Sequence, residues 1–86
     1  MKLIAKKKPV EVEVIQYKGI NSLTEIIVWC GSKAKYRRVK QQLFIETLEG
    51  TLEAKLGDYI VKGVKGEFYP VEKSIFEETY DIVKEK

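Results

Sequence analysis

Four short strand-like segments follow one another closely between residues 43 and 69. Turn-forming residues separate them, first Glu49-Gly50, then Gly57-Asp58 and then Lys65-Gly66. Parallel neighbours in a sheet need a connection of about a dozen residues or more, usually a helix, so strands this close must pair antiparallel. The segments cover residues 43–48, 51–56, 59–62 and 67–69.

The N-terminal third predicts one more strand, followed by a helix. Residues 10–14 alternate apolar and acidic side chains, and Ile15 and Tyr17 extend this strand-like stretch from Pro9 toward Gly19. Ser22 and Glu25 have the spacing of a capping box, and Gly31 is placed to end the helix. The apolar stripe expected to face the core consists of Leu23, Ile26, Ile27 and Cys30.

A second capping box, Ser74 with Glu77, predicts a short C-terminal helix that carries Phe76 and Tyr80. We therefore expect one α+β domain over residues 1–86, with residues 1–8 as a flexible basic arm. Its core would be a small, strongly curved antiparallel sheet of about five strands with two short helices, in the order β-α-β-β-β-β-α. Residues 81–86 fit either a continuation of the helix or a closing strand.

Two details of the strands follow from local chemistry. A two-residue turn at Glu49-Gly50 would set Glu46 opposite Glu53, and facing like charges are unfavourable, so a three-residue loop is expected there. Pro70 is expected to end the last strand because it has no N–H group to donate.

The residues that are missing exclude several kinds of chemistry. The chain has no histidine, which removes Ser-His-Asp and Cys-His catalysis and histidine-ligated metals. Its one cysteine, Cys30, lies on the predicted core stripe and is expected to be an inert buried thiol. We therefore expect no metal, no cofactor and no enzymatic activity. No apolar run is long enough to span a bilayer, and the expected location is the cytoplasm.

Positive charge is concentrated in the first half of the chain. Residues 1–40 contain ten Lys or Arg and three Glu, whereas residues 41–86 contain six Lys and ten Asp or Glu. The most basic segment, residues 33–40, surrounds Tyr36 with cations and fits a solvated edge strand, an exposed loop or a nucleic-acid contact. Its candidate anion contacts are Lys35, Arg37, Arg38 and Lys40.

Glycines and aromatic residues supply the remaining candidates. Asp58 beside Gly57 is expected to accept a local backbone hydrogen bond. Gly63 and Gly66 fit a tight hairpin with a close backbone approach, or backbone N–H groups presented to a small anion or nucleotide. The candidate protein interface consists of aromatics on or near predicted elements, namely Trp29, Tyr36, Tyr59 and Tyr69.

Nearly the whole chain resembles a family of small phage and prophage proteins known for a Pro-Gly-Asp-Tyr-Gly signature. The resemblance lies in residues 8–12, 15–17, 23–27, 47–50, 57–70 and 75–80; at the signature this chain reads Leu56-Gly57-Asp58-Tyr59-Ile60. It implies a phage accessory protein inside a bacterium and carries over no catalytic residue. A non-catalytic module that binds a host or phage protein, or a second copy of itself, is the expected function.

Overall fold

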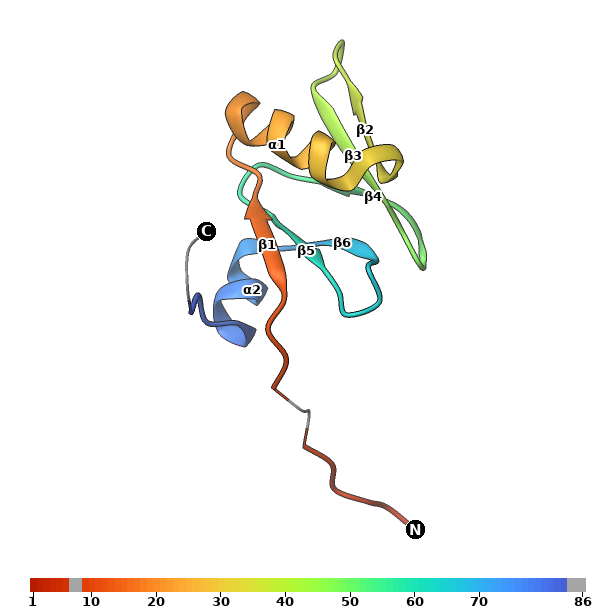
Figure 1. Cartoon of the computed structure of the whole chain (residues 1–86), viewed down its shortest axis with the longest axis vertical. Coiled ribbons are helices and arrows are strands. Elements are labelled where there is room, and N and C mark those ends of the chain that lie inside the picture. The colour runs from red at the N-terminus through yellow and green to blue at the C-terminus, as the bar shows by residue number, and fades with distance from the viewer. Residues whose placement is uncertain (7–8, 84–86) are drawn as a thin grey trace.

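The computed structural model describes residues 1–6 and 9–83, and these form two helices and six strands (Figure 1). Residues 1–6, 9–12 and 81–83 belong to no helix or strand. The expected flexible arm at residues 1–8 lies partly outside the described residues, and so does the segment 81–86, for which a helix or a strand was expected. The elements are β1 Glu13–Gln16, α1 Ile20–Cys30, a 3-10 turn Gly31–Lys33, β2 Ala34–Arg37, β3 Gln42–Thr47, β4 Gly50–Ala54, β5 Tyr59–Lys62, β6 Phe68–Val71 and α2 Lys73–Thr79.

The strands form two sheets of three strands each, and all four strand pairs are antiparallel. Sheet A has the order β1-β5-β6, and sheet B has the order β2-β3-β4. The α+β class and the antiparallel pairing are thus confirmed, but a single sheet of about five strands is wrong. The basic segment supplies an additional strand, β2, and the turn at residues 55–58 carries the chain from sheet B into sheet A, where β5 pairs with β1.

The main core lies between α1 and the two sheets. Ile26, Leu43, Ile45 and Ile60 are fully buried there, and the stripe on α1 faces them, with Ile27 half-buried at its edge. Because only apolar side chains are buried among the described residues, burial of apolar surface stabilises this core without a buried polar network. The cluster comprises Tyr17, Leu23, Ile26, Cys30, Leu43, Ile45, Ala54, Ile60 and Phe68.

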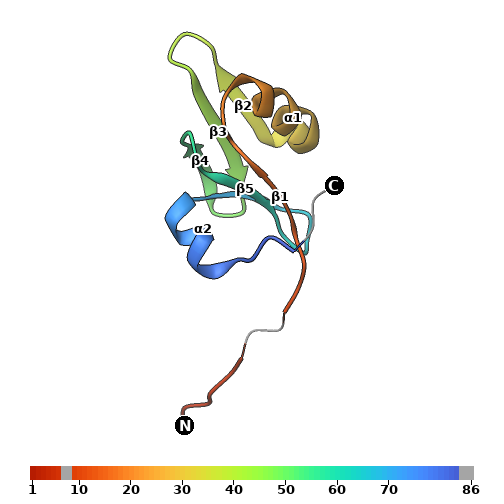
Figure 2. The same ribbon diagram turned by 90° about the vertical axis from the view of Figure 1, so that its left-hand side faces the viewer.

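Sheet A has a second covered face. Ile60 and Val61 are adjacent in β5 and both fully buried, so this strand is covered on both sides, since successive side chains point to opposite faces. Ile60 belongs to the main core, whereas Tyr59, on the side of Val61, stacks on Phe76 of α2 with 3.8 Å between ring centroids. Sheet A therefore lies between the main core and α2, as Figure 2 also shows.

Both helices begin before the predicted caps. Gly19, with a φ of 127°, is the N-cap of α1, and the Ser22 hydroxyl bonds back to it, donating to the Gly19 carbonyl at 2.8 Å. Glu72 is the N-cap of α2, and the Ser74 hydroxyl donates to the Glu72 carboxylate at 2.7 Å. Neither serine caps a helix, so both predicted capping boxes are wrong. The end of α1 at Gly31 is confirmed: its N–H donates to the carbonyl of Ile27.

Two predictions about strand ends are also wrong. The β3–β4 connection is a two-residue turn, Leu48-Glu49, which pairs Glu46 with Thr51 and so separates Glu46 from Glu53 without a longer loop. Pro70 lies inside β6, opposite Ile60. It is tolerated because β6 is an edge strand of sheet A, where a residue without an N–H group breaks no ladder on its outer side.

Candidate functional site

Three of the four candidate interface aromatics pack inside the domain. Trp29 meets Phe68 edge to face, with ring centroids 5.1 Å apart, and is half-buried against the main core. Tyr59 stacks on Phe76, and the hydroxyls of Tyr69 and Tyr80 are 3.4 Å apart. Since these contacts hold elements of the domain together, the four aromatics do not form one common surface.

The exception is Tyr36, which lines an open groove. We call this cavity of about 370 Å³ the hairpin groove, because the turn between β2 and β3 forms one wall. The N-terminus of α1 and the end of β4 form the others. Its lining residues are Tyr17, Gly19, Ile20, Leu23, Tyr36, Gln41, Glu53, Ala54, Lys55 and Leu56.

The rim of the hairpin groove carries two exposed aliphatic side chains beside the exposed polar residues Gln41 and Lys55, whereas its floor belongs to the core. Ile20 is 76% exposed and Leu56 is 71% exposed, while Tyr17, Leu23 and Ala54 are buried. Large aliphatic side chains this exposed, next to a concave surface with a tyrosine wall, are typical of a surface that binds another molecule. The cavity beside the β5–β6 turn has no tyrosine in its lining.

Two tyrosines that line the hairpin groove have hydroxyls without a hydrogen-bond partner among the described residues. Tyr17 is only 5% exposed, and its hydroxyl forms no hydrogen bond with another described residue. No fully buried side-chain nitrogen or oxygen of the described part lacks a partner, so this hydroxyl is accessible to solvent, and Tyr17 lines the open groove. Burial raises the pKa of Tyr17, and the neighbouring Tyr36 raises it further. The hydroxyl therefore keeps its proton at neutral pH and is a hydrogen-bond donor.

The basic segment forms a hairpin at one end of the domain. Figures 1 and 2 show the turn between β2 and β3 at the end of the folded body opposite α2. Lys35 and Arg37 lie on the outward side of β2, while Arg38 and Lys40 lie in the turn, and all four are exposed. None of them forms an ion pair with a described residue.

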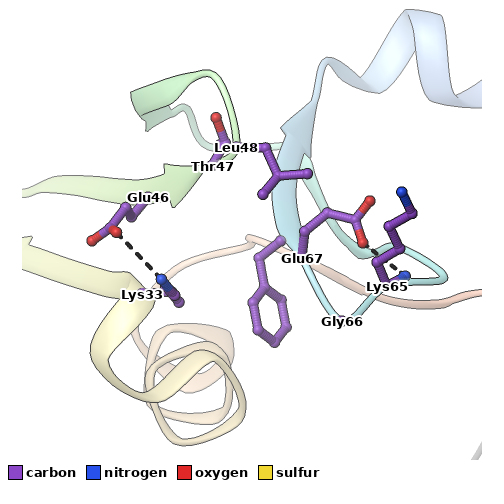
Figure 3. Close-up of a pocket in the computed structure, with 8 residues that line it drawn as sticks. Lys33, Glu46, Thr47, Leu48, Lys65, Gly66 and Glu67 are labelled. Atoms are coloured by element: carbon purple, nitrogen blue, oxygen red, sulfur yellow. Dashed lines mark hydrogen bonds and ion pairs between the residues drawn. The ribbon is translucent and has the colours of Figure 1, made fainter.

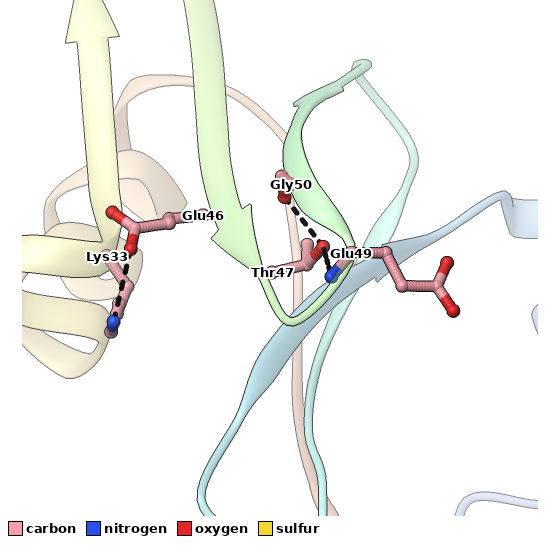
Figure 4. Close-up of polar contacts among 5 residues, drawn as sticks. All are labelled: Lys33, Glu46, Thr47, Glu49 and Gly50. Carbon is pink, nitrogen blue, oxygen red and sulfur yellow. Dashed lines mark hydrogen bonds and ion pairs between the residues drawn. The ribbon is translucent and has the colours of Figure 1, made fainter.

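One end of the basic segment is neutralised within the protein. Lys33 forms an ion pair with Glu46 at 3.3 Å, near the β3–β4 turn, where the Thr47 hydroxyl accepts from the Glu49 N–H and donates to the Gly50 carbonyl (Figure 4). Farther along, the Arg37 guanidinium lies 5.6 Å from the centroid of the Phe44 ring. The unpaired positive charge is thus concentrated toward the turn.

A second cavity, of about 280 Å³, lies beside the β5–β6 turn (Figure 3). An anion site at Gly63 and Gly66 would need free N–H groups, but the turn uses them internally. The Gly63 N–H donates to the Glu67 carbonyl at 2.7 Å, and the Gly66 N–H donates to the Gly63 carbonyl at 3.0 Å. The Lys65 N–H donates to the Glu67 carboxylate at 3.0 Å, so Glu67 occupies the place where a bound anion would lie.

The Glu67 carboxylate also explains why position 63 is a glycine, and the predicted close approach at Gly63 is confirmed. A Cβ atom at position 63 would lie 2.5 Å from the Glu67 carboxyl carbon. We expect Glu67→Ala to lower the free energy of unfolding by about 0.5–1.5 kcal/mol through loss of the Lys65 hydrogen bond. Gly63→Ala should cost about as much, because the new methyl group displaces the carboxylate.

The losses of stability from the two substitutions should not add, because both substitutions remove the same hydrogen bond, from the Lys65 N–H to the Glu67 carboxylate. In the Glu67→Ala background, Gly63→Ala should be neutral, or stabilising by up to about 1 kcal/mol through lower entropy of the unfolded chain. Urea unfolding of the two single variants and the double variant measures this coupling. Additive losses would contradict the contact between the Glu67 carboxylate and Gly63.

The Gly57-Asp58 motif is a structural turn, as expected from its residues. The Asp58 carboxylate accepts from the Lys55 N–H at 2.8 Å, and Gly57 has a φ of 98°, which a residue with a side chain rarely adopts. The turn is attached to the end of β1, since the Gly57 N–H donates to the Tyr17 carbonyl and the Tyr17 N–H donates to the Asp58 carbonyl. It thereby places Leu56 beside the hairpin groove.

The described residues present no activated nucleophile and no metal cluster. Burial raises the pKa of the Cys30 thiol to about 11, which keeps it protonated, and burial with the hydrogen bond to Tyr80 raises the pKa of Tyr69 to about 12. Within residues 1–6 and 9–83, no group of three or more Asp, Glu or Cys side chains could hold a metal ion. None of the helices in this part of the chain is long and apolar enough to cross a membrane.

Comparisons with protein-family models, with curated proteins and with solved structures found no match. The three residues that give the hairpin groove its character, Tyr17, Ile20 and Leu56, were not among the sequence candidates. Ile20 and Leu56 lie next to glycines at predicted element ends, which was the one local signal that they could be exposed.

Proposed function

We propose that this protein is a non-catalytic binding module that attaches to another protein through the hairpin groove. The observation that carries the proposal is the pair of exposed aliphatic residues, Ile20 and Leu56, on the rim of a groove walled by Tyr36. Protein interfaces combine an apolar centre with aromatic and cationic neighbours, and the basic turn between β2 and β3 adjoins this rim. The cavity beside Glu67 offers no comparable exposed apolar pair.

The proposal includes a phage or prophage origin and a bacterial or phage partner, as the family resemblance implies. The chemistry of the site supports a binding role over a catalytic one. Asp58 and Glu67 each accept a hydrogen bond from a backbone N–H group, and the Cys30 thiol is buried and protonated. A general acid or base needs a partner group in a defined role, and the hairpin groove brings no such pair together.

Site-specific photocrosslinking tests the groove as the binding face. A benzoylphenylalanine placed at Ile20 or at Leu56 should yield one discrete protein adduct in cells of the bacterial host. Val28 and Val64 are the matched controls, because they are 79% and 70% exposed but do not line the groove. The same probe at either control position should give no such adduct. Equal adducts from all four positions would contradict the groove as the binding face.

Nucleic-acid binding is the second candidate, supported by the unpaired cations of the β2–β3 hairpin. Phosphate contacts make affinity fall steeply with salt, so binding to DNA or RNA at several salt concentrations identifies this function. The hairpin carries no exposed aromatic for base stacking, since Tyr36 lines the groove and Arg37 lies over Phe44. For this reason a protein partner is the preferred proposal.

A further inference from the structure

The N-terminus of α1 opens into the hairpin groove with its donors unused. Gly19 and Ile20 both line the groove, and α1 has no side-chain cap and no acidic residue in its first turn. The first backbone hydrogen bond of α1 runs from the Leu23 N–H to the Gly19 carbonyl. The N–H groups before it carry the positive end of the helix dipole, which attracts an anionic group.

A second, independent feature points at the same place. Tyr17 lines the groove with only 5% of its surface exposed, and its solvent-accessible hydroxyl has no hydrogen-bond partner among the described residues. This hydroxyl is therefore free to donate to an acceptor on a ligand. Tyr36 lines the same cavity and supplies another hydroxyl that has no hydrogen bond within the described protein.

The charges in the lining of the groove balance each other. Its one cation, Lys55, is paired with its one carboxylate, Glu53, at 3.3 Å. Two further cations are neighbours of lining residues in the chain: Lys18 lies between Tyr17 and Gly19, and Lys40 precedes Gln41. The groove therefore places the neutral donors of Tyr17 and of the start of α1 beside two exposed aliphatic side chains, with no unpaired carboxylate in its lining.

We propose that the hairpin groove holds a carboxylate of an acidic partner segment, with Tyr17 and the first N–H groups of α1 as its donors. An aliphatic side chain of the same segment packs on Ile20 and Leu56. A polypeptide supplies both groups from adjacent residues, whereas a nucleic acid offers phosphates but no aliphatic side chain. The inference rests on the proposed function, because it names the chemistry of the partner at the same face.

Nuclear magnetic resonance on the isotope-labelled full chain tests the carboxylate directly. The probes are N-acetyl-aspartyl-leucinamide and its asparaginyl analogue, which differ in one charged oxygen. The aspartyl probe should shift the amide signals of Ile20, Asn21 and Ser22 at millimolar concentration, and the asparaginyl probe should leave them in place. Equal shifts with both probes, or no shifts, would overturn the proposed carboxylate.

A conservative variant tests the role of Tyr17. Tyr17→Phe keeps the ring in the core and removes only the hydroxyl, so the affinity for the aspartyl probe should fall about tenfold, the size of one hydrogen bond to a charged group. Tyr69→Phe is the matched control, because its hydroxyl is bonded to Tyr80 outside the groove. An unchanged affinity in folded Tyr17→Phe would contradict its assignment as a donor.

The outcomes separate this inference from the function on which it rests. Groove-specific crosslinks at Ile20 and Leu56 without discrimination between the two probes would end the carboxylate inference and leave the binding face intact. If neither the groove-specific crosslinks nor the difference between the two probes is observed, the binding face and the carboxylate inference are both wrong. Larger shifts with inorganic phosphate or a DNA oligonucleotide than with the aspartyl probe would instead favour a phosphate ligand and overturn the acidic polypeptide.

Discussion

Phe76→Ala should lower the free energy of unfolding by about 3–5 kcal/mol, the range measured for loss of a buried aromatic ring. Phe76 is buried at the centre of a stack, with ring centroids 3.8 Å from Tyr59 and 4.7 Å from Tyr80 and interplanar angles of 13° and 9°. Each aromatic pair adds about 0.5–1.5 kcal/mol beyond the burial of its area. The variant therefore loses both the ring's own burial and its two stacking partners.

The expected structural result is the detachment of α2 from sheet A. A helix of seven residues is too short to be stable alone, so it depends on this stack. Urea denaturation followed by circular dichroism measures the loss, and Ile75→Ala, at a neighbouring position that is 53% exposed, should change stability by less than about 0.5 kcal/mol. A loss below about 1 kcal/mol in Phe76→Ala would show that other contacts attach α2.

Trp29→Ala should destabilise the domain by about 2–4 kcal/mol, somewhat less than a fully buried aromatic because the side chain is half-buried. The indole packs edge to face on Phe68, which itself belongs to the core cluster. This contact connects α1 to β6 of sheet A. Trp29→Phe retains an aromatic ring at this contact and should cost clearly less. Thermal and urea unfolding of both variants measure the difference.

The outcome for Trp29 decides between packing and recognition. The neighbouring Val28 is 79% exposed, so Val28→Ala is the matched control and should change stability by no more than about 0.5 kcal/mol. If Trp29→Ala were as stable as the wild type and lost a bound protein, Trp29 would belong to the interface. The proposed binding face would then extend from the hairpin groove along α1.

Local sequence patterns predicted most elements correctly. The apolar spacing of Leu23, Ile26 and Cys30 identified the buried face of α1, and the turn residues indicated four successive strands, although the β3–β4 turn itself is Leu48-Glu49. The turn role of Asp58 and the close approach at Gly63 were also recognised, because hydrogen bonding within four residues and the small size of glycine act locally.

The helix starts were predicted less well, for a physical reason. A serine three residues before a glutamate fits a capping box, but the chain before α1 turns at Gly19, which adopts a positive φ and needs no side-chain cap. Ser22 therefore bonds back to the preceding backbone instead of starting the helix. The packing of Tyr17 and Leu23 into the core is consistent with the earlier start.

The candidate site could be predicted only in part. Composition and charge pointed to the basic segment, and its cations are exposed on the β2–β3 hairpin. The aromatic candidates do not form one surface, because Tyr59 stacks on Phe76 of α2 and the Tyr69 hydroxyl contacts that of Tyr80, directly after α2. The hairpin groove combines residues of α1, β2 and β4 with residues of the segments that follow β1, β2 and β4, which no local pattern could bring together.

The sequence alone determined the class of the domain, the antiparallel pairing and the absence of histidine chemistry, since these depend on residue types and on connections too short for crossovers. Only the tertiary structure decided that the strands divide into two sheets and that Glu67 fills its own turn. It also decided that Tyr17 and the start of α1 face one groove with Ile20 and Leu56. Such arrangements depend on contacts between residues far apart in the chain, whereas periodicity and turn preference act over a few neighbours.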